Sequence, residues 1–194
     1  MPITYTPIRY PGGKSKLYPL IDAVIEANEL TGCTYAEAYC GGAGLAIKLL
    51  LKGRVSKILL NDVDPAVYSM WDAIVNHADE LCGFLREVPL DIDEWRGMKE
   101  VFESASEPSF DLGKAALYLN RTNRSGILRG GPIGGMSQAS RYGIGARFNR
   151  EDLCRKIMNI AARSNDIELF NDDAVDFIEE ELIVREGLFA NFDP

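Results

Sequence analysis

The chain of 194 residues carries a formal net charge of −8, and 46% of its residues are hydrophobic and 26% charged. This composition is ordinary for a globular protein with one sizeable core, and the apolar runs are too short to cross a bilayer. Residues 1–10 contain Arg9 but no apolar segment typical of a signal peptide, so we expect a cytoplasmic protein with no membrane partner.

The cysteines do not have the spacing of a metal site. Cys33, Cys40, Cys82 and Cys154 form no C-x-x-C pair, and His77 is the single histidine of the chain. We therefore expect no metal and no disulfide framework, and mostly buried, reduced thiols.

Positive charge is concentrated in one part of this acidic chain. Residues 114–156 hold nine Lys and Arg against two acidic residues, a local charge of +7 that leaves −15 for the remainder. Such a segment favours contact with a polyanion; the alternative is a solvated loop that happens to carry arginines.

Short apolar runs and longer amphipathic stretches alternate along the chain. The stretches with apolar residues at helical spacing predict helices over 15–30, 45–51, 65–76, 151–163 and 173–181, the first of them capped by Ser15. Residues 78–118 are also expected to be helical, with a polar break at 104–109. The short apolar runs predict strands over 34–39, 56–62, 167–170 and 188–192.

This alternation predicts an α/β fold with a parallel sheet. Residues 126–145 contain seven glycines, which is typical of a functional loop or hairpin inside a compact domain. The simplest organisation is a core of residues 1–76 and 151–194 with a mostly helical, glycine-looped insertion at 77–150.

A glycine turn and an acid follow the first two predicted strands. Gly41-Gly42-Ala43-Gly44 lets a ligand approach the backbone at a helix N-terminus, and Asp62 lies 18 residues after Gly44, where an acid accepts hydrogen bonds from ribose hydroxyls. Glu37 just before the turn would repel a pyrophosphate but attract a cofactor with a sulfonium and an amine. The pattern favours an adenosine-containing cofactor of that kind.

Three further stretches could carry function. Tyr10-Pro11-Gly12-Gly13-Lys14 forms a tight turn, which on its own is typical of a protein surface. Residues 119–127 gather amide, guanidinium and hydroxyl groups that hydrogen-bond base edges and phosphates, although helix capping and loop hydrogen bonding explain them equally well. Asp193 follows the last predicted strand, where active-site acids collect in open α/β sheets; the alternative is a frayed tail.

In this order, the motifs resemble the Dam-type, adenine-specific DNA methyltransferases, which use S-adenosylmethionine. The matching stretches are Tyr10–Lys14, Ala36–Gly44, Asn61–Pro65, Asn120–Ile127, Arg147–Asn149 and Phe192–Pro194. The resemblance covers the whole chain and implies a Rossmann-like methyltransferase sheet, with residues 77–150 as the DNA target-recognition region.

The resemblance also implies roles for individual residues. Its cofactor-binding positions are Tyr10, Gly12, Lys14, Glu37, Gly41, Gly44, Asp62 and Asp173, with Asp172 competing for the last of these. Glu37 would face the methionine ammonium and Asp62 the ribose, and Cys40 stands where a phenylalanine is more usual. The DNA-contacting positions are Arg121, Asn123, Arg124 and Ser125, to which the glycine-rich loop adds Arg129 and Arg141.

Asp193 and Pro194 match the first half of the catalytic Asp-Pro-Pro-Tyr. The family pattern continues with a second proline, a tyrosine and further strands, so we expect the C-terminal part of the sheet to be missing. This implies a truncated chain with negligible methyl transfer.

The expected partner is duplex DNA with a flipped adenine. Self-association through an exposed sheet edge is also expected, whereas any restriction partner lies outside the sequence. Two alternatives remain open: a catalytically dead module that binds cofactor or DNA with a regulatory role, and a methyltransferase of the same fold acting on a non-DNA substrate.

Overall fold

The structure, a computed structural model, describes residues 4–193 and is built on a parallel four-stranded sheet. The strand order is β3-β2-β1-β4. The strands are β1 (Thr34–Glu37), β2 (Lys57–Asn61), β3 (Ile167–Phe170) and β4 (Leu188–Asn191). Every adjacent pair of strands runs parallel. In β1, for example, Ala36 pairs with Leu59 of β2 on one side and with Ala190 of β4 on the other. The predicted α/β class with a parallel sheet is confirmed.

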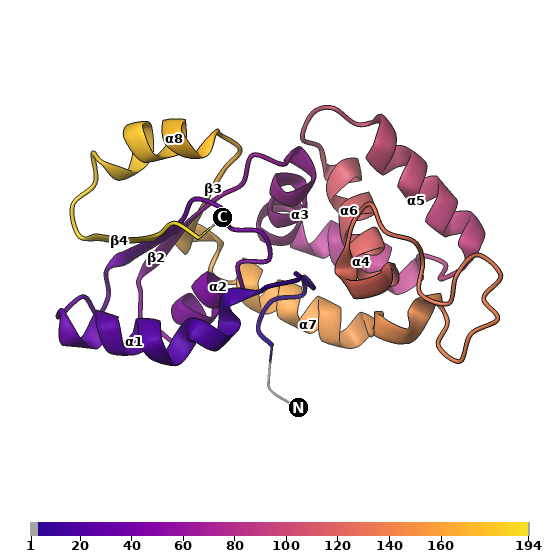
Figure 1. Ribbon diagram of the computed structural model, residues 1–194, viewed down its shortest axis with the longest axis horizontal. Coiled ribbons are helices and arrows are strands. Elements are labelled where there is room, and N and C mark those ends of the chain that lie inside the picture. Colours follow the sequence, from indigo (N-terminus) through magenta and orange to yellow (C-terminus); the bar gives the residue numbers. More distant parts are fainter. Residues whose placement is uncertain (1–3, 194) are drawn as a thin grey trace.

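The helices lie on both faces of the sheet and beside it (Figure 1). The α-helices of the described residues are α1 (Tyr18–Ala27), α2 (Gly44–Leu51), α3 (Pro65–Asn76), α4 (Ala78–Glu87), α5 (Ile92–Ser104), α6 (Phe110–Thr122), α7 (Arg150–Ala161) and α8 (Ala174–Phe177). Short 3-10 turns occupy Lys14–Leu17, Arg124–Gly126, Ile144–Arg147 and Ser164–Asp166, and α8 continues as a π-helical turn over Ile178–Leu182.

The sheet is buried on both faces because its strands alternate between two hydrophobic clusters. In β2, Ile58 and Leu60 join the large cluster, whereas Leu59 faces the small cluster formed with Ala174 and Phe177 of α8. Alternate side chains of a strand point to opposite faces, so a continuous apolar run is what a strand covered on both sides requires. Figure 1 shows α8 on one side of the sheet and α1 with α2 on the other.

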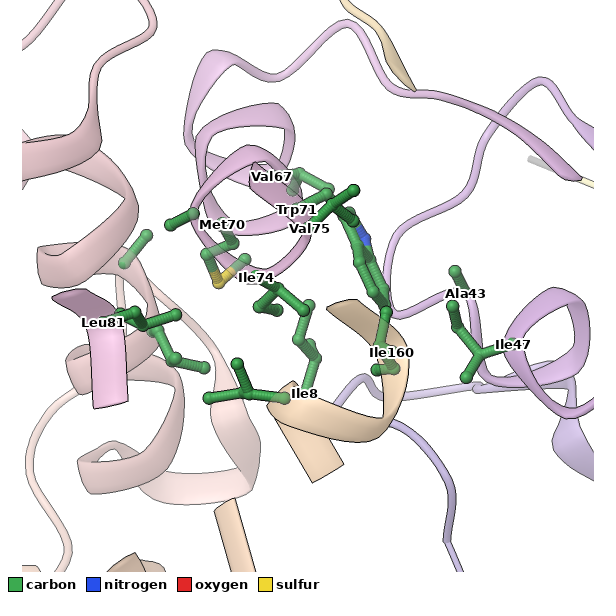
Figure 2. Packing of buried hydrophobic residues seen from close by; sticks show 14 of the residues in the cluster. Ile8, Ala43, Ile47, Val67, Met70, Trp71, Ile74, Val75, Leu81 and Ile160 are labelled. Atoms are coloured by element: carbon green, nitrogen blue, oxygen red, sulfur yellow. The ribbon is translucent and has the colours of Figure 1, made fainter. Parts of the chain in front are cut away.

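The large cluster continues without interruption from the sheet into the helical part. Val67, Met70, Trp71 and Ile74 of α3 lie at its centre, and Figure 2 shows them between Leu81 on one side and residues of α2 and α7 on the other. The predicted insertion at 77–150 is therefore packed onto the sheet part through α3, with a shared core.

Local sequence explains how α3 begins and how closely it packs. Asp64 caps it by accepting a hydrogen bond from the Ala66 N–H at 2.8 Å, and Pro65 fits the first turn because its missing N–H would have no helical partner. On α6, a Cβ at Gly113 would lie 2.3 Å from the Ser69 carbonyl oxygen, so glycine permits the close approach of α6 to α3.

Several predicted boundaries are wrong. The stretch 78–118 contains three helices instead of two, since the chain also breaks between Glu87 and Ile92, around Pro89. Ser15 does not cap a helix but lies within a 3-10 turn, and α1 begins at Tyr18 with Pro19 in its first turn. The helix predicted over 173–181 is α-helical for one turn only. No helix among residues 4–193 is long and apolar enough to cross a membrane.

Candidate functional site

A cavity of about 850 Å³ opens at the carboxyl ends of β1, β2 and β4. Seven residues that the sequence assigned to cofactor or catalysis line it, namely Tyr10, Gly12, Lys14, Glu37, Gly44, Asp62 and Asp193. The N-terminal strap, which we define as residues 4–13, supplies one wall, and the glycine turn after β1 supplies another. Parallel strands bring their carboxyl ends to one edge, which explains why acids distant in sequence meet there.

The glycine turn has a backbone shape that tolerates little else. Gly41 has φ +45° and Ala43 has φ 39°, both in the left-handed region. A Cβ at Gly41 would lie 2.7 Å from Cζ of Tyr10, so the tyrosine ring rests directly on the turn. The indole N–H of Trp71 donates to the Gly41 carbonyl at 2.8 Å and fixes the turn from the other side.

Asp62 is tied to the same turn. Its Oδ2 accepts the Gly41 N–H at 2.9 Å and its Oδ1 accepts the Asp64 N–H at 3.1 Å. Burial raises the pKa of this carboxyl, and the two backbone donors act against that rise. These bonds fix the carboxylate at the cavity wall, and each oxygen keeps a second lone pair for a ligand.

Glu37 is a buried carboxylate at the end of β1. Its side chain is 1% exposed, and Oε1 accepts a hydrogen bond from the Tyr35 hydroxyl at 3.2 Å. Burial raises the pKa of Glu37 to about 7, although the positive charge of Lys14 and the Tyr35 hydrogen bond both favour ionisation. A cation entering the cavity would satisfy this carboxylate.

Lys14 and Asp193 form an ion pair at the cavity wall. The Lys14 Nζ lies 3.6 Å from Asp193 Oδ2 and also donates to the Asp193 main-chain carbonyl. The Asp193 side chain is 58% exposed. Pro194, the other predicted catalytic residue, lies outside the described residues.

Two predicted cofactor positions are not part of the described cavity wall. Gly41 is not among the lining residues, but its N–H donates to Asp62 and it lies against the Tyr10 ring, both of which line the cavity. Asp173 caps α8, where its Oδ1 accepts the Val175 N–H at 2.8 Å, and the competing Asp172 is held through its backbone by the side-chain amide of Asn61. Neither aspartate is among the cavity-lining residues that the structure describes.

The end of α6 uses two of the predicted DNA-contacting side chains internally. Asn123 is fully buried; its Oδ1 accepts the Trp95 indole N–H at 2.7 Å and its Nδ2 donates to the carbonyls of Ile127 and Leu128 at 2.9 Å each. For this residue the structure favours loop hydrogen bonding, the alternative explanation, because its polar atoms already have protein partners.

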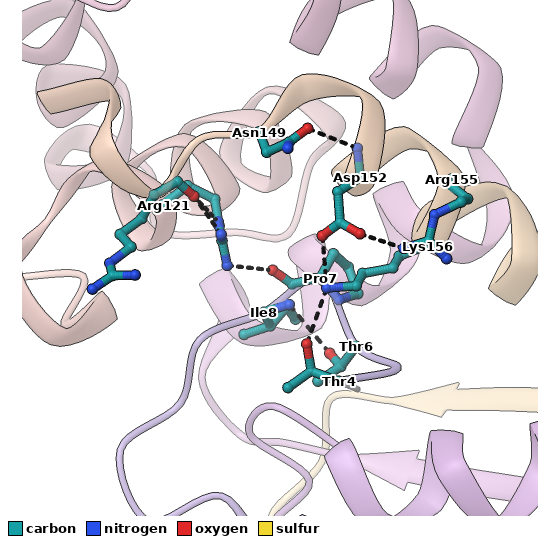
Figure 3. A network of polar contacts seen from close by, with 10 residues as sticks. Thr4, Thr6, Pro7, Ile8, Arg121, Asn149, Asp152, Arg155 and Lys156 are labelled. Carbon is teal, nitrogen blue, oxygen red and sulfur yellow. Dashed lines mark hydrogen bonds and ion pairs between the residues drawn. The ribbon is translucent and has the colours of Figure 1, made fainter. Parts of the chain in front are cut away.

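The Arg121 side chain also makes its hydrogen bonds within the protein. Its guanidinium donates to the carbonyls of Pro7, at 3.1 Å, and Arg147, at 2.9 Å from Nε. Burial lowers the pKa of Arg121 to about 10. Figure 3 shows this residue joined to the strap, which Lys156 of α7 also holds through Thr4, at 3.0 Å.

The other predicted DNA-contacting residues are exposed. Arg124, Ser125, Arg129 and Arg141 all lie on the surface, and Ser125 also lines the cavity with φ 57°. Arg129 and Arg141 stack over aromatic rings, on Phe102 at 5.7 Å and Tyr142 at 5.5 Å. These side chains remain available to a polyanion.

Sequence reasoning missed five cavity-lining residues, which lie outside its motifs: Arg9, Ser15, Thr4, Thr6 and Ile8. The proximity of Arg9 and Ser15 to the Tyr10–Lys14 motif was the available signal for the first two. Across residues 4–193 no group of three His, Cys, Asp or Glu gathers as a metal site would require.

The family comparison agrees with this geometry. Residues 10–184 match the family of D12 class N6 adenine-specific DNA methyltransferases. The chain belongs to this family. Enzymes of the D12 class methylate adenine in DNA and generally use S-adenosylmethionine, and the parallel sheet is consistent with a Rossmann-like methyltransferase fold. The match begins at Tyr10, so it includes the strap's last residues as well as the helical part. No curated protein matches the chain.

Proposed function

We propose that the cavity at the carboxyl edge of the sheet binds S-adenosylmethionine and that its residues belong to the machinery for methyl transfer to the N6 amine of adenine in duplex DNA. The observation that carries the proposal is the meeting of Glu37, Asp62 and Asp193 around one cavity whose wall is a glycine turn. The three acids come from the ends of three different strands.

The cavity residues fit the chemistry of this cofactor. The buried Glu37 suits an ammonium, because a cation relieves the cost of a desolvated carboxylate. Asp62 retains acceptor capacity for ribose hydroxyls. The buried carboxylate of Glu37 disfavours a phosphate group at the end of β1 and so disfavours a nucleotide such as ATP there.

For the reaction itself we assign the acceptor role to Asp193, with the adjoining Pro194 carbonyl as its partner. The exocyclic amine of adenine is a poor nucleophile because its lone pair is delocalised, and a target base must leave the stack to be reached. Two acceptors on the amine hydrogens would direct the lone pair out of the ring plane. S-adenosylmethionine supplies an electrophilic methyl group on a positive sulfur, so positioning accounts for most of the catalysis.

We assign DNA contact to the exposed side chains Arg124, Ser125, Arg129 and Arg141. They belong to the segment with a local charge of +7. Charge of this kind supplies most of the non-specific affinity for a phosphate backbone. Arg121 and Asn123 contribute by holding the loop that presents these residues.

Turnover is a separate question from binding. Asp193 is 58% exposed and its Oδ2 lies 3.6 Å from Lys14 Nζ, so in this arrangement the carboxylate faces an ammonium group instead of an amine hydrogen. We expect negligible methyl transfer, which is also what the alternative of a cofactor- or DNA-binding module with a regulatory role requires. Incorporation of labelled methyl groups into DNA at an enzyme-like rate would contradict this expectation.

Calorimetric titration tests the binding proposal. S-adenosylmethionine and S-adenosylhomocysteine should bind, ATP should not, and Asp62→Ala should abolish the signal. Glu180→Gln serves as a control because Glu180 is exposed on the π-helical turn, away from the cavity. Equal affinity for ATP would refute the assignment of the cavity.

Two further expectations belong to this proposal. The edge strand β4 pairs with β1 on one side only among the described residues, so sedimentation at rising concentration should reveal self-association. The second expectation is a cytoplasmic location, which cell fractionation tests.

A further inference from the structure

Asn120 is a buried amide that joins two walls of the cavity. It lies in the last turn of α6, is 1% exposed, and is not among the cavity-lining residues that the structure describes. Its Oδ1 accepts the Arg9 N–H at 2.8 Å, and its Nδ2 donates to the Arg9 carbonyl at 2.8 Å and to the Gly126 carbonyl at 3.0 Å. All three bonds go to backbone, so Asn120 fixes the course of two chain segments.

The first of these segments leads directly to the cofactor side of the cavity. Arg9 precedes Tyr10, whose ring rests on the glycine turn at Gly41 and Gly42. Because Asn120 holds both the N–H and the carbonyl of Arg9, a shift of this amide must move the tyrosine that covers the turn.

The second segment leads to the DNA side. Gly126 follows Ser125, which lines the cavity in a left-handed conformation, and Arg124, an exposed candidate for DNA contact. Such conformations in non-glycine residues persist only where the surroundings hold them. The bond from Asn120 to the Gly126 carbonyl supplies one such restraint.

The two segments also touch each other. A Cβ at Gly126, which has φ +78°, would lie 2.5 Å from the Arg9 carbonyl oxygen. A side chain fits neither the backbone conformation nor the space, so the strap and the turn are in direct backbone contact. The Arg9 guanidinium adds a bond to the Asn123 carbonyl at 3.2 Å.

We propose that Asn120 is a positioning residue that couples the cofactor side of the cavity to the DNA-contacting turn, so that DNA and cofactor bind cooperatively. The inference rests on the proposed function, since it assumes both ligands. DNA that orders the turn at Arg124–Gly126 also orders Arg9 and Tyr10, and coupling of this kind is reciprocal.

The test is a binding cycle that does not depend on activity. The dissociation constant of S-adenosylhomocysteine is measured by calorimetry in the absence and in the presence of sonicated duplex DNA at low salt. We expect DNA to tighten binding by about fivefold or more, the usual range for coupled sites. Asn120→Ala should reduce this factor to about one while both ligands still bind.

The matched control is Thr122→Val. Thr122 is also buried in the last turn of α6, but its hydroxyl donates only to the Tyr118 carbonyl of the same helix, at 2.8 Å. This variant should lose some stability and retain the wild-type coupling factor. A residue with a merely structural role would behave like Thr122.

A second variant changes the contact between Arg9 and Gly126 at the glycine. Gly126→Ala should also abolish coupling, because the added Cβ displaces the Arg9 carbonyl. If Asn120→Ala does not fold, the coupling factor of Gly126→Ala provides the test instead. An unchanged coupling factor in either folded variant, or no coupling in the wild type, would overturn the role of Asn120 and leave the proposed function intact. Failure of the wild type to bind either ligand would overturn both.

Discussion

The hydroxyl of Tyr35 donates a hydrogen bond to Glu37 Oε1 at 3.2 Å along the same face of β1. Residues two apart on a strand share a face, so this bond fixes the carboxylate before any ligand is present. It also favours the ionised form of Glu37, against the burial that raises the pKa to about 7. The protonation of Glu37 therefore responds to whatever enters the cavity.

Cofactor affinity should depend on pH through Glu37. An ammonium favours the ionised carboxylate, so binding below the pKa of about 7 must release a proton. The affinity for S-adenosylhomocysteine should rise by about tenfold from about pH 6 to about pH 8 and then level off. Calorimetry in buffers of different ionisation enthalpy measures the proton released. In Tyr35→Phe the midpoint should move upward, and a flat profile in the wild type would contradict the prediction.

Stability should depend on pH in the opposite direction. Between the ordinary glutamate pKa of 4.5 and about 7, the folded state keeps a proton that the unfolded chain has released. The free energy of unfolding therefore falls as pH rises through this window, by up to about 3 kcal/mol from Glu37 alone. Glu37→Gln should lack this part of the slope, whereas Glu180→Gln should keep it. Urea denaturation at several pH values gives the difference.

Two glycines in helices should respond oppositely to alanine. At Gly113 a Cβ would meet the Ser69 carbonyl at 2.3 Å, and Gly113→Ala should cost about 2 kcal/mol or more through displacement of α6 from α3. At Gly97 of α5 nothing lies within 4 Å, and Gly97→Ala should stabilise by about 0.5–1 kcal/mol. Thermal denaturation followed by circular dichroism measures both. Equal effects would mean that the α3–α6 contact is looser than described.

Substitutions of Asn123 and its neighbour Arg124 should differ in their effect on stability. Asn123→Ala leaves the Trp95 indole and two loop carbonyls without a partner and should cost about 2–3 kcal/mol of stability. Arg124→Ala should change stability little because its side chain is exposed. Chemical denaturation of the two variants tests this, and a stable Asn123→Ala protein would restore the case for a direct DNA contact.

DNA affinity should depend on salt through the exposed arginines. Replacement of Arg124 by alanine should weaken duplex binding and reduce the slope of log affinity against log salt by about one. Arg96→Ala on α5 is the control, since Arg96 is equally exposed but pairs with Asp93 at 3.2 Å. Fluorescence anisotropy over a salt series provides the slopes. An identical slope in both variants would remove Arg124 from the DNA surface.

The sheet and the residues at its edge could be predicted because their signals are local. Buried strands read as continuous apolar runs, and the carboxyl ends of parallel strands must meet, so Glu37, Asp62 and Asp193 could be expected together. Helix boundaries were harder. Pro89 was a local signal for the break between α4 and α5, whereas no residue type marks the π-helical turn that begins at Ile178. Asp173 shows the limit of a spacing argument: it follows β3 as expected, but its carboxylate caps α8.

The direction of polar side chains could not be predicted from their type. Asn123 and Arg124 are neighbours with similar capacity for base and phosphate contacts, but one is fully buried and the other exposed. The difference arises from the partners that tertiary structure supplies, namely Trp95 on α5 and the carbonyls of the following loop. Trp95 is far from Asn123 in the sequence, so no local pattern predicts the hydrogen bond between them.

The pairing of β2 with β3 has a consequence for folding. These adjacent strands are separated in the chain by all the helices from α3 to α7. Contacts within that helical stretch are closer in sequence than the strand pair, and closure of so long a loop is entropically unfavourable until its interior is ordered. We expect α3, α6 and α7 to become protected from hydrogen exchange before β3 in pulse-labelled refolding. The cavity would then form last, when β3 and β4 dock on a helical part that has already folded.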